Sequence, residues 1–142
     1  MSIARIIDIG ASGLTAQRLR MQVTTANLVN VETTRTADGG PYRRRTVIFS
    51  DDPGDPFRFR NELSRVLSGV RVDRIAQDGS PPILRFQPGH PDADPNGYVA
   101  FPNINLPAEM ADLMSAVRSY EANLTVIRSA RGLWQQTLSL LR

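Results

Sequence analysis

Residues 107–142 read PAEMADLMSAVRSYEANLTVIRSARGLWQQTLSLLR. Apolar side chains recur here at alternating spacings of three and four residues, broken only where Arg131 occupies an apolar position. The residues of this apolar seam are Met110, Leu113, Val117, Tyr120, Leu124, Ile127, Trp134, Leu138 and Leu141. A heptad pattern of this kind predicts one long helix that packs in a coiled-coil-like manner.

The start of this helix is also indicated by the sequence. Asn105 is a residue type favoured at the N-cap, and Pro107 suits the first turn of a helix. Glu109 and Asp112 follow, where acidic side chains interact favourably with the positive end of the helix dipole. We therefore expect the helix to begin at about residue 107.

A second helix is predicted over residues 2–31, which contain no proline. The positions between its apolar residues are small or polar, as at Gly10, Gln17 and Thr24, so its apolar stripe is narrow. The stripe recurs every seven residues, at Ile7, Leu14, Met21 and Leu28. This spacing places the four side chains along one side of a helix.

The segment between the two helices contains nine of the ten prolines and seven of the ten glycines, which excludes long helices there. Short extended runs bounded by turn signals are expected at Tyr42–Phe49, Gly69–Ala76, Ile83–Gln87 and Tyr98–Phe101, with a helical turn or loop at Asn61–Leu67. The fold class is therefore α+β, with two long terminal helices forming a coiled-coil-like layer and a small antiparallel β-rich domain between them. The expected divisions are residues 1–32, 33–106 and 107–142.

The residue types present argue against an enzyme. The chain has no cysteine, and its single histidine, His90, lies in a proline-rich loop without a second histidine to complete a metal site. The sequence has no phosphate-binding glycine motif and no nucleophile that could be matched with a base. We expect no catalytic residue, metal, cofactor or small-molecule substrate. The first residues lack a basic segment followed by an apolar one, so a Sec signal peptide is not expected.

All 17 basic residues are arginine, and several are clustered in the middle segment. Arg43, Arg44 and Arg45 could contact nucleic acid, with Arg58, Arg60 and Arg65 further along. Acidic residues are interleaved at Asp51, Asp52, Asp55 and Glu62, and would repel phosphate. A solvated or subunit-contacting strand is the favoured interpretation, with no nucleic-acid partner. An arginine-rich adaptor for nucleic acid or an acidic surface is the alternative.

Periodicity alone leaves open what covers the apolar seam. A seam of this type forms either the core of a hairpin within one molecule or a contact between subunits. A pair of helices that buries only one stripe each is a weak structure by itself, and further copies would supply the missing burial.

Three segments resemble the flagellar rod and hook family. The first runs from Ile9 to Met21 and continues to the pattern A-N-x-x-N at Ala26, Asn27 and Asn30. The usual T-P-G-Y after this pattern is absent, and residues 33–42 read TTRTADGGPY instead. The loop of residues 88–99 and the junction of residues 101–106 are similar to those of short subunits of the proximal rod. The third segment, residues 109–123, contains the family pattern at Ser119, Tyr120, Ala122 and Asn123.

This resemblance implies a structural subunit of the flagellar basal-body rod, a helical periplasmic tube that transmits torque from the motor to the hook and filament. The expected partners are other copies of the chain, other rod subunits and, during secretion, the flagellar type III export apparatus. The terminal helices would line the inner wall of the tube. Another type III secretion rod component is a second alternative.

Overall fold

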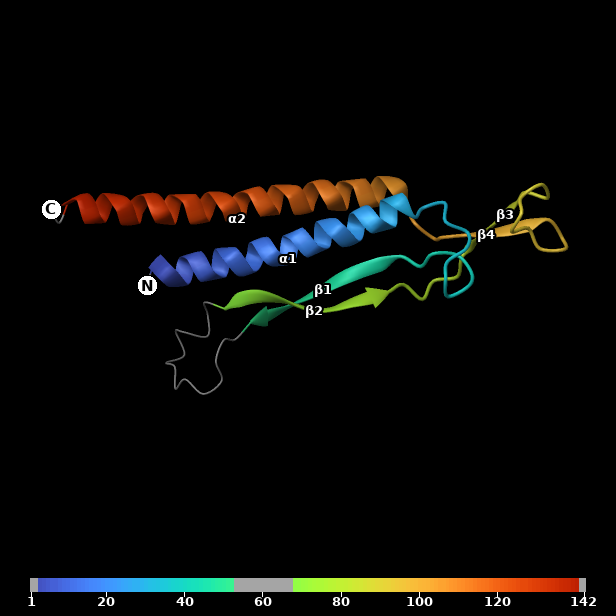
Figure 1. Cartoon of the computed structure of the whole chain (residues 1–142), viewed down its shortest axis with the longest axis horizontal. Coiled ribbons are helices and arrows are strands. Elements are labelled where there is room, and N and C mark those ends of the chain that lie inside the picture. The colour runs from blue at the N-terminus through green and yellow to red at the C-terminus, as the bar shows by residue number, and fades with distance from the viewer. Residues whose placement is uncertain (1–2, 53–67, 141–142) are drawn as a thin grey trace.

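The computed structural model describes residues 3–52 and 68–140, and it shows an elongated α+β protein (Figure 1). Its elements are α1 (Ile3–Val29), β1 (Arg45–Asp52), β2 (Gly69–Gln77), β3 (Ile83–Phe86), β4 (Tyr98–Phe101) and α2 (Leu106–Leu140). The predicted fold class is confirmed, and every strand predicted within the described residues is present. The predicted turn or loop at Asn61–Leu67 and the seam residue Leu141 lie outside the described residues.

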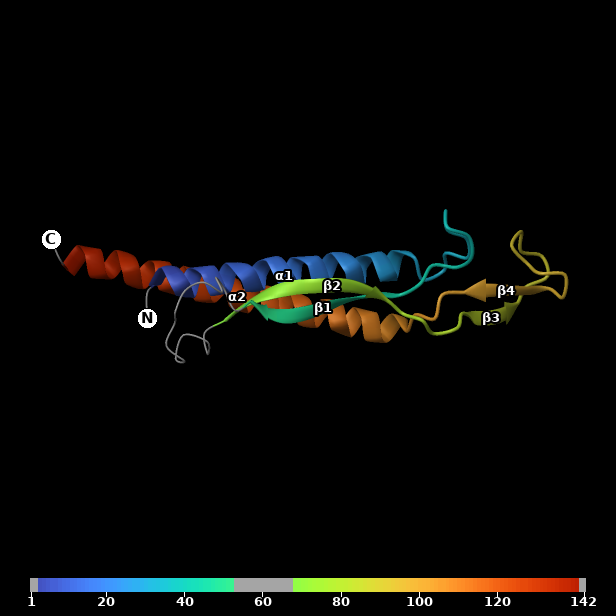
Figure 2. The same ribbon diagram turned by 90° about the horizontal axis from the view of Figure 1, so that it is seen from below.

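The two helices lie side by side in an antiparallel pair (Figures 1 and 2). The predicted N-cap of α2 is confirmed, because the Oδ1 atom of Asn105 accepts a hydrogen bond of 3.1 Å from the backbone N–H of Ala108. Asn105 also accepts the backbone N–H of Glu109 with its carbonyl at 3.0 Å. The helix therefore begins at Leu106, one residue before the predicted start.

α1 ends at Val29, two residues before the predicted end, because Asn30 closes it. The Asn30 side chain donates to the carbonyl of Ala26 at 2.8 Å, and the Asn30 backbone N–H donates to the same carbonyl at 3.1 Å. The hydroxyl of Thr33 in turn donates to Asn30 Oδ1 at 3.1 Å. A polar side chain that satisfies a terminal carbonyl ends a helix without glycine.

The strands form two separate antiparallel sheets of two strands each. β1 and β2 pair from Arg45↔Gln77 to Asp52↔Gly69, with a shift of register between Ile48 and Phe49. β3 and β4 pair from Ile83↔Phe101 to Phe86↔Tyr98. The middle segment was predicted to form one small β-rich domain, and in the structure its two hairpins lie apart along the length of the molecule (Figure 1).

Three layers result from this arrangement. α1 lies between α2 on one side and the β1–β2 sheet on the other (Figure 1). The hydroxyl of Ser12 accepts a hydrogen bond of 3.1 Å from the backbone N–H of Val70, which links α1 to β2. β3 and β4 form an arm that extends beyond one end of the helix pair, and the C-terminus lies at the other end (Figures 1 and 2). We call residues 83–101 the β3–β4 arm.

The hydrophobic core is small and divided. Where α1 meets α2, the buried apolar residues are Ala16, Val23, Ala116 and Ala130. A second group, Val99, Phe101 and Ile104, lies in β4 and in the segment between β4 and α2, and Tyr42, between α1 and β1, is also buried. Many large apolar side chains of the described residues remain exposed, including Met110, Met114, Leu133 and Trp134. The fold of a single chain therefore buries only part of its apolar surface.

Candidate assembly surfaces

Small and polar side chains form the contact between the two helices. Gly10 lies against Ile127, and Gly13 lies against the side chain of Asn123. Further along, Arg20 and Thr24 of α1 bond to Asp112, and Asn27 bonds to Glu109. These α1 positions are three, four or seven residues apart, so they form a second line beside the predicted apolar stripe.

The two glycines allow α1 to approach α2 closely near Asn123 and Ile127. A Cβ atom built on Gly10 would lie 2.8 Å from Cγ1 of Ile127, and one on Gly13 would lie 2.8 Å from Nδ2 of Asn123. Neither distance is compatible with an ordinary van der Waals contact. Both glycines lower the helix propensity of α1, but they permit a close contact between the two helices.

This geometry predicts opposite effects for the same substitution at two helical glycines. Gly132 has no neighbour within 4 Å of a built Cβ, so Gly132→Ala should stabilise α2 by about 0.5–1 kcal/mol through helix propensity alone. Gly10→Ala has the same intrinsic gain but forces Ile127 to move, at a cost of about 1–3 kcal/mol. Thermal unfolding followed by circular dichroism should rank Gly132→Ala above the unmodified chain and Gly10→Ala below it. Equal gains from both substitutions would show that α1 and α2 do not meet at Gly10.

A buried polar cluster joins the end of α1 to the start of both β1 and α2. Its centre is Asn27, which is 1% exposed. The Asn27 side-chain amide donates to the carbonyl of Arg45 at 2.8 Å and to Glu109 Oε2 at 2.9 Å. Its Oδ1 atom accepts the backbone N–H of Arg45 at 2.9 Å and the hydroxyl of Tyr42 at 3.1 Å. The Asn27 side chain of α1 thus binds two segments that are distant in sequence, residues 42–45 and the first turn of α2.

Glu109 completes this cluster from the first turn of α2. Its carboxylate is buried, and its Oε1 atom accepts a hydrogen bond of 2.6 Å from Nε of Arg44. The Glu109 carboxylate is therefore paired with the guanidinium of Arg44 and also accepts a hydrogen bond from the Asn27 amide. Burial raises the pKa of the Tyr42 hydroxyl, with Arg45 opposing this shift and Glu109 adding to it, so the phenol stays a hydrogen-bond donor. We call Asn27, Tyr42, Arg44 and Glu109 the junction cluster.

A second ionic contact lies one helical turn along α2. Arg20 forms a salt bridge with Asp112, and the hydroxyl of Thr24 donates to Asp112 Oδ2 at 3.2 Å. Burial alone would raise the pKa of the Asp112 carboxyl, but the hydrogen bonds and charge of Arg20 outweigh it and hold that pKa below its ordinary value. The stabilisation is therefore present at neutral pH and is lost as the pH falls through the lowered pKa.

The predicted apolar seam lies beside this contact line and is only partly covered. Within the described residues the half-buried members are Ile7, Leu14, Met21, Leu28, Leu113, Tyr120, Leu124 and Ile127. The exposed members are Met110, Val117, Trp134 and Leu138. The helix pair of one chain thus leaves part of the seam uncovered along α2, and we call its exposed members Met110, Val117, Trp134 and Leu138 the α2 apolar face.

The family-pattern residues have different surroundings. Asn27 is buried in the junction cluster, whereas Ala26 and Asn30 are half-buried at the end of α1. On α2, Asn123 lies over Gly13, and the remaining positions are half-buried at Ser119 and Tyr120 and exposed at Ala122. Sequence reasoning did not identify Arg20, Arg44 or Glu109 as contact residues. The sequence does carry a signal for this helix contact, namely the spacing by three and four residues of small and polar side chains from Gly10 to Asn27.

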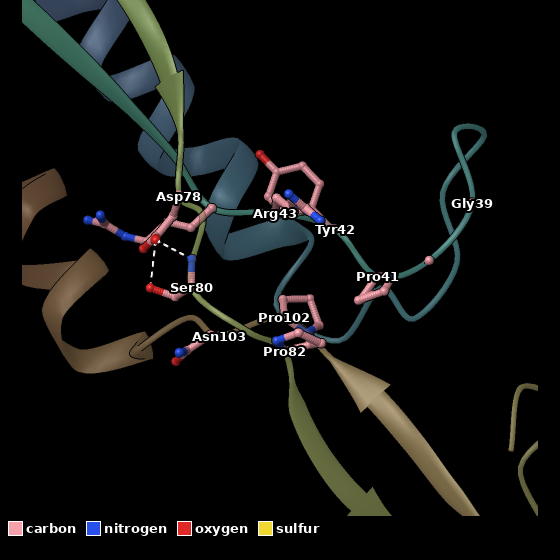
Figure 3. Close-up of a pocket in the computed structure, with 11 residues that line it drawn as sticks. Gly39, Pro41, Tyr42, Arg43, Asp78, Ser80, Pro82, Pro102 and Asn103 are labelled. Atoms are coloured by element: carbon pink, nitrogen blue, oxygen red, sulfur yellow. Dashed lines mark hydrogen bonds between the residues drawn. The ribbon is translucent and has the colours of Figure 1, made fainter. Parts of the chain in front are cut away.

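A small cavity of about 120 Å³ lies where the segments after α1, after β2 and after β4 meet (Figure 3). Pro41, Pro82 and Pro102 line it, and Asp78 at its edge accepts hydrogen bonds from the backbone and hydroxyl of Ser80 (Figure 3). Among the described residues no three histidine, cysteine, aspartate or glutamate side chains are grouped as metal ligands would be. Nor does α1 or α2, as described, have an apolar stretch sufficient to cross a bilayer.

The arginines of the described residues are mostly engaged within the protein. Arg20 and Arg44 pair with Asp112 and Glu109, and Arg35 lies 3.7 Å from Asp92. The guanidinium of Arg45 lies over the Tyr42 ring at 5.6 Å. The arginine-rich segment near β1 is therefore largely committed to internal contacts. Arg58, Arg60 and Arg65 lie outside the described residues.

Comparisons with known proteins agree with this architecture. Residues 7–35 match the family described as flagella basal body rod protein, and residues 96–140 match the flagellar basal body rod FlgEFG protein C-terminal family. These two regions contain nearly all of α1 and α2.

Full-length relatives extend the match over the whole chain. The chain is 43% identical to the flagellar basal-body rod protein FlgC of Borreliella burgdorferi, over 100% of this chain and 99% of that protein. It is 37% identical to FlgC of Bacillus subtilis over 99% of each, and 37% identical to FlgC of Salmonella typhimurium over 99% of this chain and 98% of that protein. The predicted resemblance is thus confirmed, and the chain belongs to the FlgC family of flagellar basal-body rod proteins.

Proposed function

We propose that this structural rod subunit acts without catalysis, as a load-bearing element of the proximal rod in the periplasm. Its partners are other copies of itself and other rod subunits, and the flagellar export apparatus delivers it. Torque passes from subunit to subunit through packed helices. The family match and the paired terminal helices support this proposal.

The observation that carries the proposal is the uncovered α2 apolar face. Burying apolar surface contributes about 25 cal/mol per Å², so a face of this kind favours association with other subunits. Monomeric soluble proteins rarely leave such a surface open along a helix of 35 residues. Neighbouring helices in a tube would cover it, whereas the small and polar line of α1 holds the helix pair of each chain together.

The arrangement also suits the transmission of force. α1 is held on both sides, by α2 and by the β1–β2 sheet (Figure 1). The junction cluster ties the end of α1 to the start of α2, and the salt bridge of Arg20 with Asp112 lies next to it. Ionic and hydrogen-bonded links between helices that are closely packed resist sliding along the helix axes. The subunit therefore behaves as one stiff body under load.

Trp134 provides a direct probe of association. It is the only tryptophan of the chain, and its side chain is 51% exposed in the isolated subunit. In dilute solution its fluorescence should peak at long wavelength and should be quenched by a soluble quencher. At concentrations where light scattering detects association, the emission should shift to shorter wavelength and should no longer be reduced by the quencher. Emission that is already short in wavelength and protected in a dilute monomer would contradict this account.

The rod assignment itself is tested by fractionation. Deleting the gene should abolish swimming, and a tagged copy that restores swimming should co-purify with isolated basal bodies after the membrane is dissolved. The adaptor alternative predicts instead that the purified chain binds nucleic acid with an affinity that falls steeply with salt concentration. Restored swimming without recovery of the chain in basal bodies would refute a structural role in the rod.

A further inference from the structure

The loop of the β3–β4 arm is organised by its histidine. The Nδ1 atom of His90 accepts a hydrogen bond of 3.1 Å from the backbone N–H of Asp92. Asparagine and aspartate side chains fix turns in the same way, by binding a backbone group two residues further on. The His90 backbone N–H also donates to the carbonyl of Gln87 at 3.0 Å, and its carbonyl accepts the N–H of Ala93 at 3.0 Å. His90 therefore holds the loop together through both its side chain and its backbone.

The His90 ring has a defined place in the arm. His90 is half-buried, and its ring packs edge to face against Phe101 with centroids 6.3 Å apart. Phe101 is itself buried in β4, and the guanidinium of Arg85 lies over the Phe101 ring at 4.7 Å. The imidazole is therefore seated against the sheet, with its Nδ1 atom directed at the Asp92 N–H.

Asp92 joins this loop to the segment that follows α1. Its Oδ2 atom accepts a hydrogen bond of 2.8 Å from the hydroxyl of Thr34, and its Oδ1 atom lies 3.7 Å from Nη1 of Arg35. Thr34 and Arg35 belong to the segment between α1 and β1. One residue thus carries both the N–H that His90 binds and the carboxylate that ties the arm to the rest of the chain.

The hydrogen bond at Nδ1 exists only while the imidazole is neutral. A neutral imidazole has one nitrogen that accepts, whereas an imidazolium donates from both nitrogens. Protonation would therefore turn the Nδ1 atom of His90 into a donor that faces a second donor, the backbone N–H of Asp92. Histidine is the side chain whose charge ordinarily changes between about pH 5 and pH 8. The contact is thus present at the upper end of this range and is lost when the ring takes up a proton.

Four charged side chains are connected to this ring by the contacts of the loop and the sheet. They are Asp92, Asp94, Arg35 and Arg85. The two arginines repel an imidazolium, and the Oδ1 atom of Asp94 already accepts two backbone N–H groups of its own turn, each at 2.8 Å. Asp92 is the acid whose own backbone contacts the ring. An imidazolium at His90 would therefore attract the Asp92 carboxylate away from Thr34.

We propose that His90 is a pH-sensitive latch between the β3–β4 arm and the segment that follows α1. While the ring is neutral, Nδ1 holds the backbone of Asp92, and the Asp92 carboxylate holds Thr34. When the ring takes up a proton from solvent, the Asp92 N–H loses its acceptor and the carboxylate turns toward the imidazolium. The arm then loses its polar contact with Thr34. This latch operates in the isolated chain and does not depend on the proposed rod function.

Nuclear magnetic resonance can measure the latch directly, because His90 is the only histidine of the chain. In a titration of the isolated chain from about pH 8 to about pH 5, all imidazole signals report the protonation of this one ring. The amide signal of Asp92 and the methyl signal of Thr34 should change along the same curve. A hydrogen bond of this kind contributes roughly a factor of ten. The protection of the Asp92 amide from hydrogen exchange, corrected for intrinsic pH dependence, should therefore fall by about tenfold.

Two variants separate the acceptor from the ring. His90→Asn keeps a side-chain oxygen that can accept the N–H of Asp92 but cannot take up a proton in this range. Its Asp92 and Thr34 signals should resemble those of the unmodified chain at the upper pH and should stay constant on acidification. His90→Ala has no acceptor, and it should resemble the acidic form throughout. Both variants lose the ring that packs on Phe101, so their difference isolates the hydrogen bond. Circular dichroism should show equal helix content in both.

Two results would overturn the latch. In the first, the His90 ring titrates while the Asp92 and Thr34 signals stay constant. In the second, His90→Asn shows the same change between the two pH values as the unmodified chain, which would make a carboxylate the titrating group. Neither result bears on whether the chain is found in basal bodies, so the latch and the rod function fail independently.

Discussion

Asn27→Asp should break the junction cluster and unfold the chain at a much lower temperature. The substitution preserves shape but replaces the amide, which donates to the Arg45 carbonyl and to Glu109, with a second carboxylate. That carboxylate would lie beside the buried carboxylate of Glu109, with only Arg44 to compensate both. Each buried polar group left unpaired costs about 1–3 kcal/mol, so the summed loss is several kcal/mol. Thermal unfolding followed by circular dichroism measures it.

Two companion variants show whether the cluster is the cause. Asn30→Ala removes the other asparagine of the family pattern, which is half-buried and bonds only locally to Ala26 and Thr33, and it should cost far less. Combining Asn27→Asp with Glu109→Gln restores an amide that can donate to a carboxylate, and it should recover part of the loss. A small effect of Asn27→Asp, or no recovery in the double variant, would contradict the assigned geometry.

Leu124→Asp should abolish swimming while the chain is still produced and still helical. Leu124 belongs to the predicted seam and is half-buried in the isolated subunit, so a carboxylate there remains partly hydrated in the monomer. In an assembled tube the same position would be enclosed by neighbouring helices. A charge enclosed without a partner costs several kcal/mol, which is enough to prevent stable assembly. Leu113→Asp, also half-buried, should act in the same way.

Thr125→Asp is the matched control for this prediction. It introduces the same charge one residue further along α2, at an exposed position whose hydroxyl bonds only to the Glu121 carbonyl of its own helix. Swarming in soft agar should be retained in this variant and absent in Leu124→Asp, with equal amounts of both chains on immunoblots. Normal swarming of Leu124→Asp would exclude the seam from the assembly contacts.

The helices and strands could be predicted because their signals are local. The N-cap at Asn105, the heptad spacing and the glycine and proline turns each fix the structure of a few neighbouring residues. The division of the strands into two sheets could not be predicted in this way. It depends on the β1–β2 sheet packing along α1, which is a contact between distant parts of the chain.

The helix contact was harder to predict because its residues are not apolar. Periodicity draws attention to Ile7, Leu14, Met21 and Leu28, yet Gly10, Gly13 and Asn27 lie directly against α2. Glycine lowers helix propensity, and its value for close approach is evident only from the position of Ile127. The role of Glu109 likewise depends on Arg44 being brought to it from the start of β1.

The most direct test of the central claim is a subunit-resolved map of isolated basal bodies that carry this chain. The account predicts that the chain occupies the proximal rod, with α1 and α2 paired through Gly10 and Gly13, and with neighbouring helices covering the α2 apolar face from Met110 to Leu138. It would be contradicted by a map in which the chain is absent from the rod, or in which that face of α2 is exposed to water.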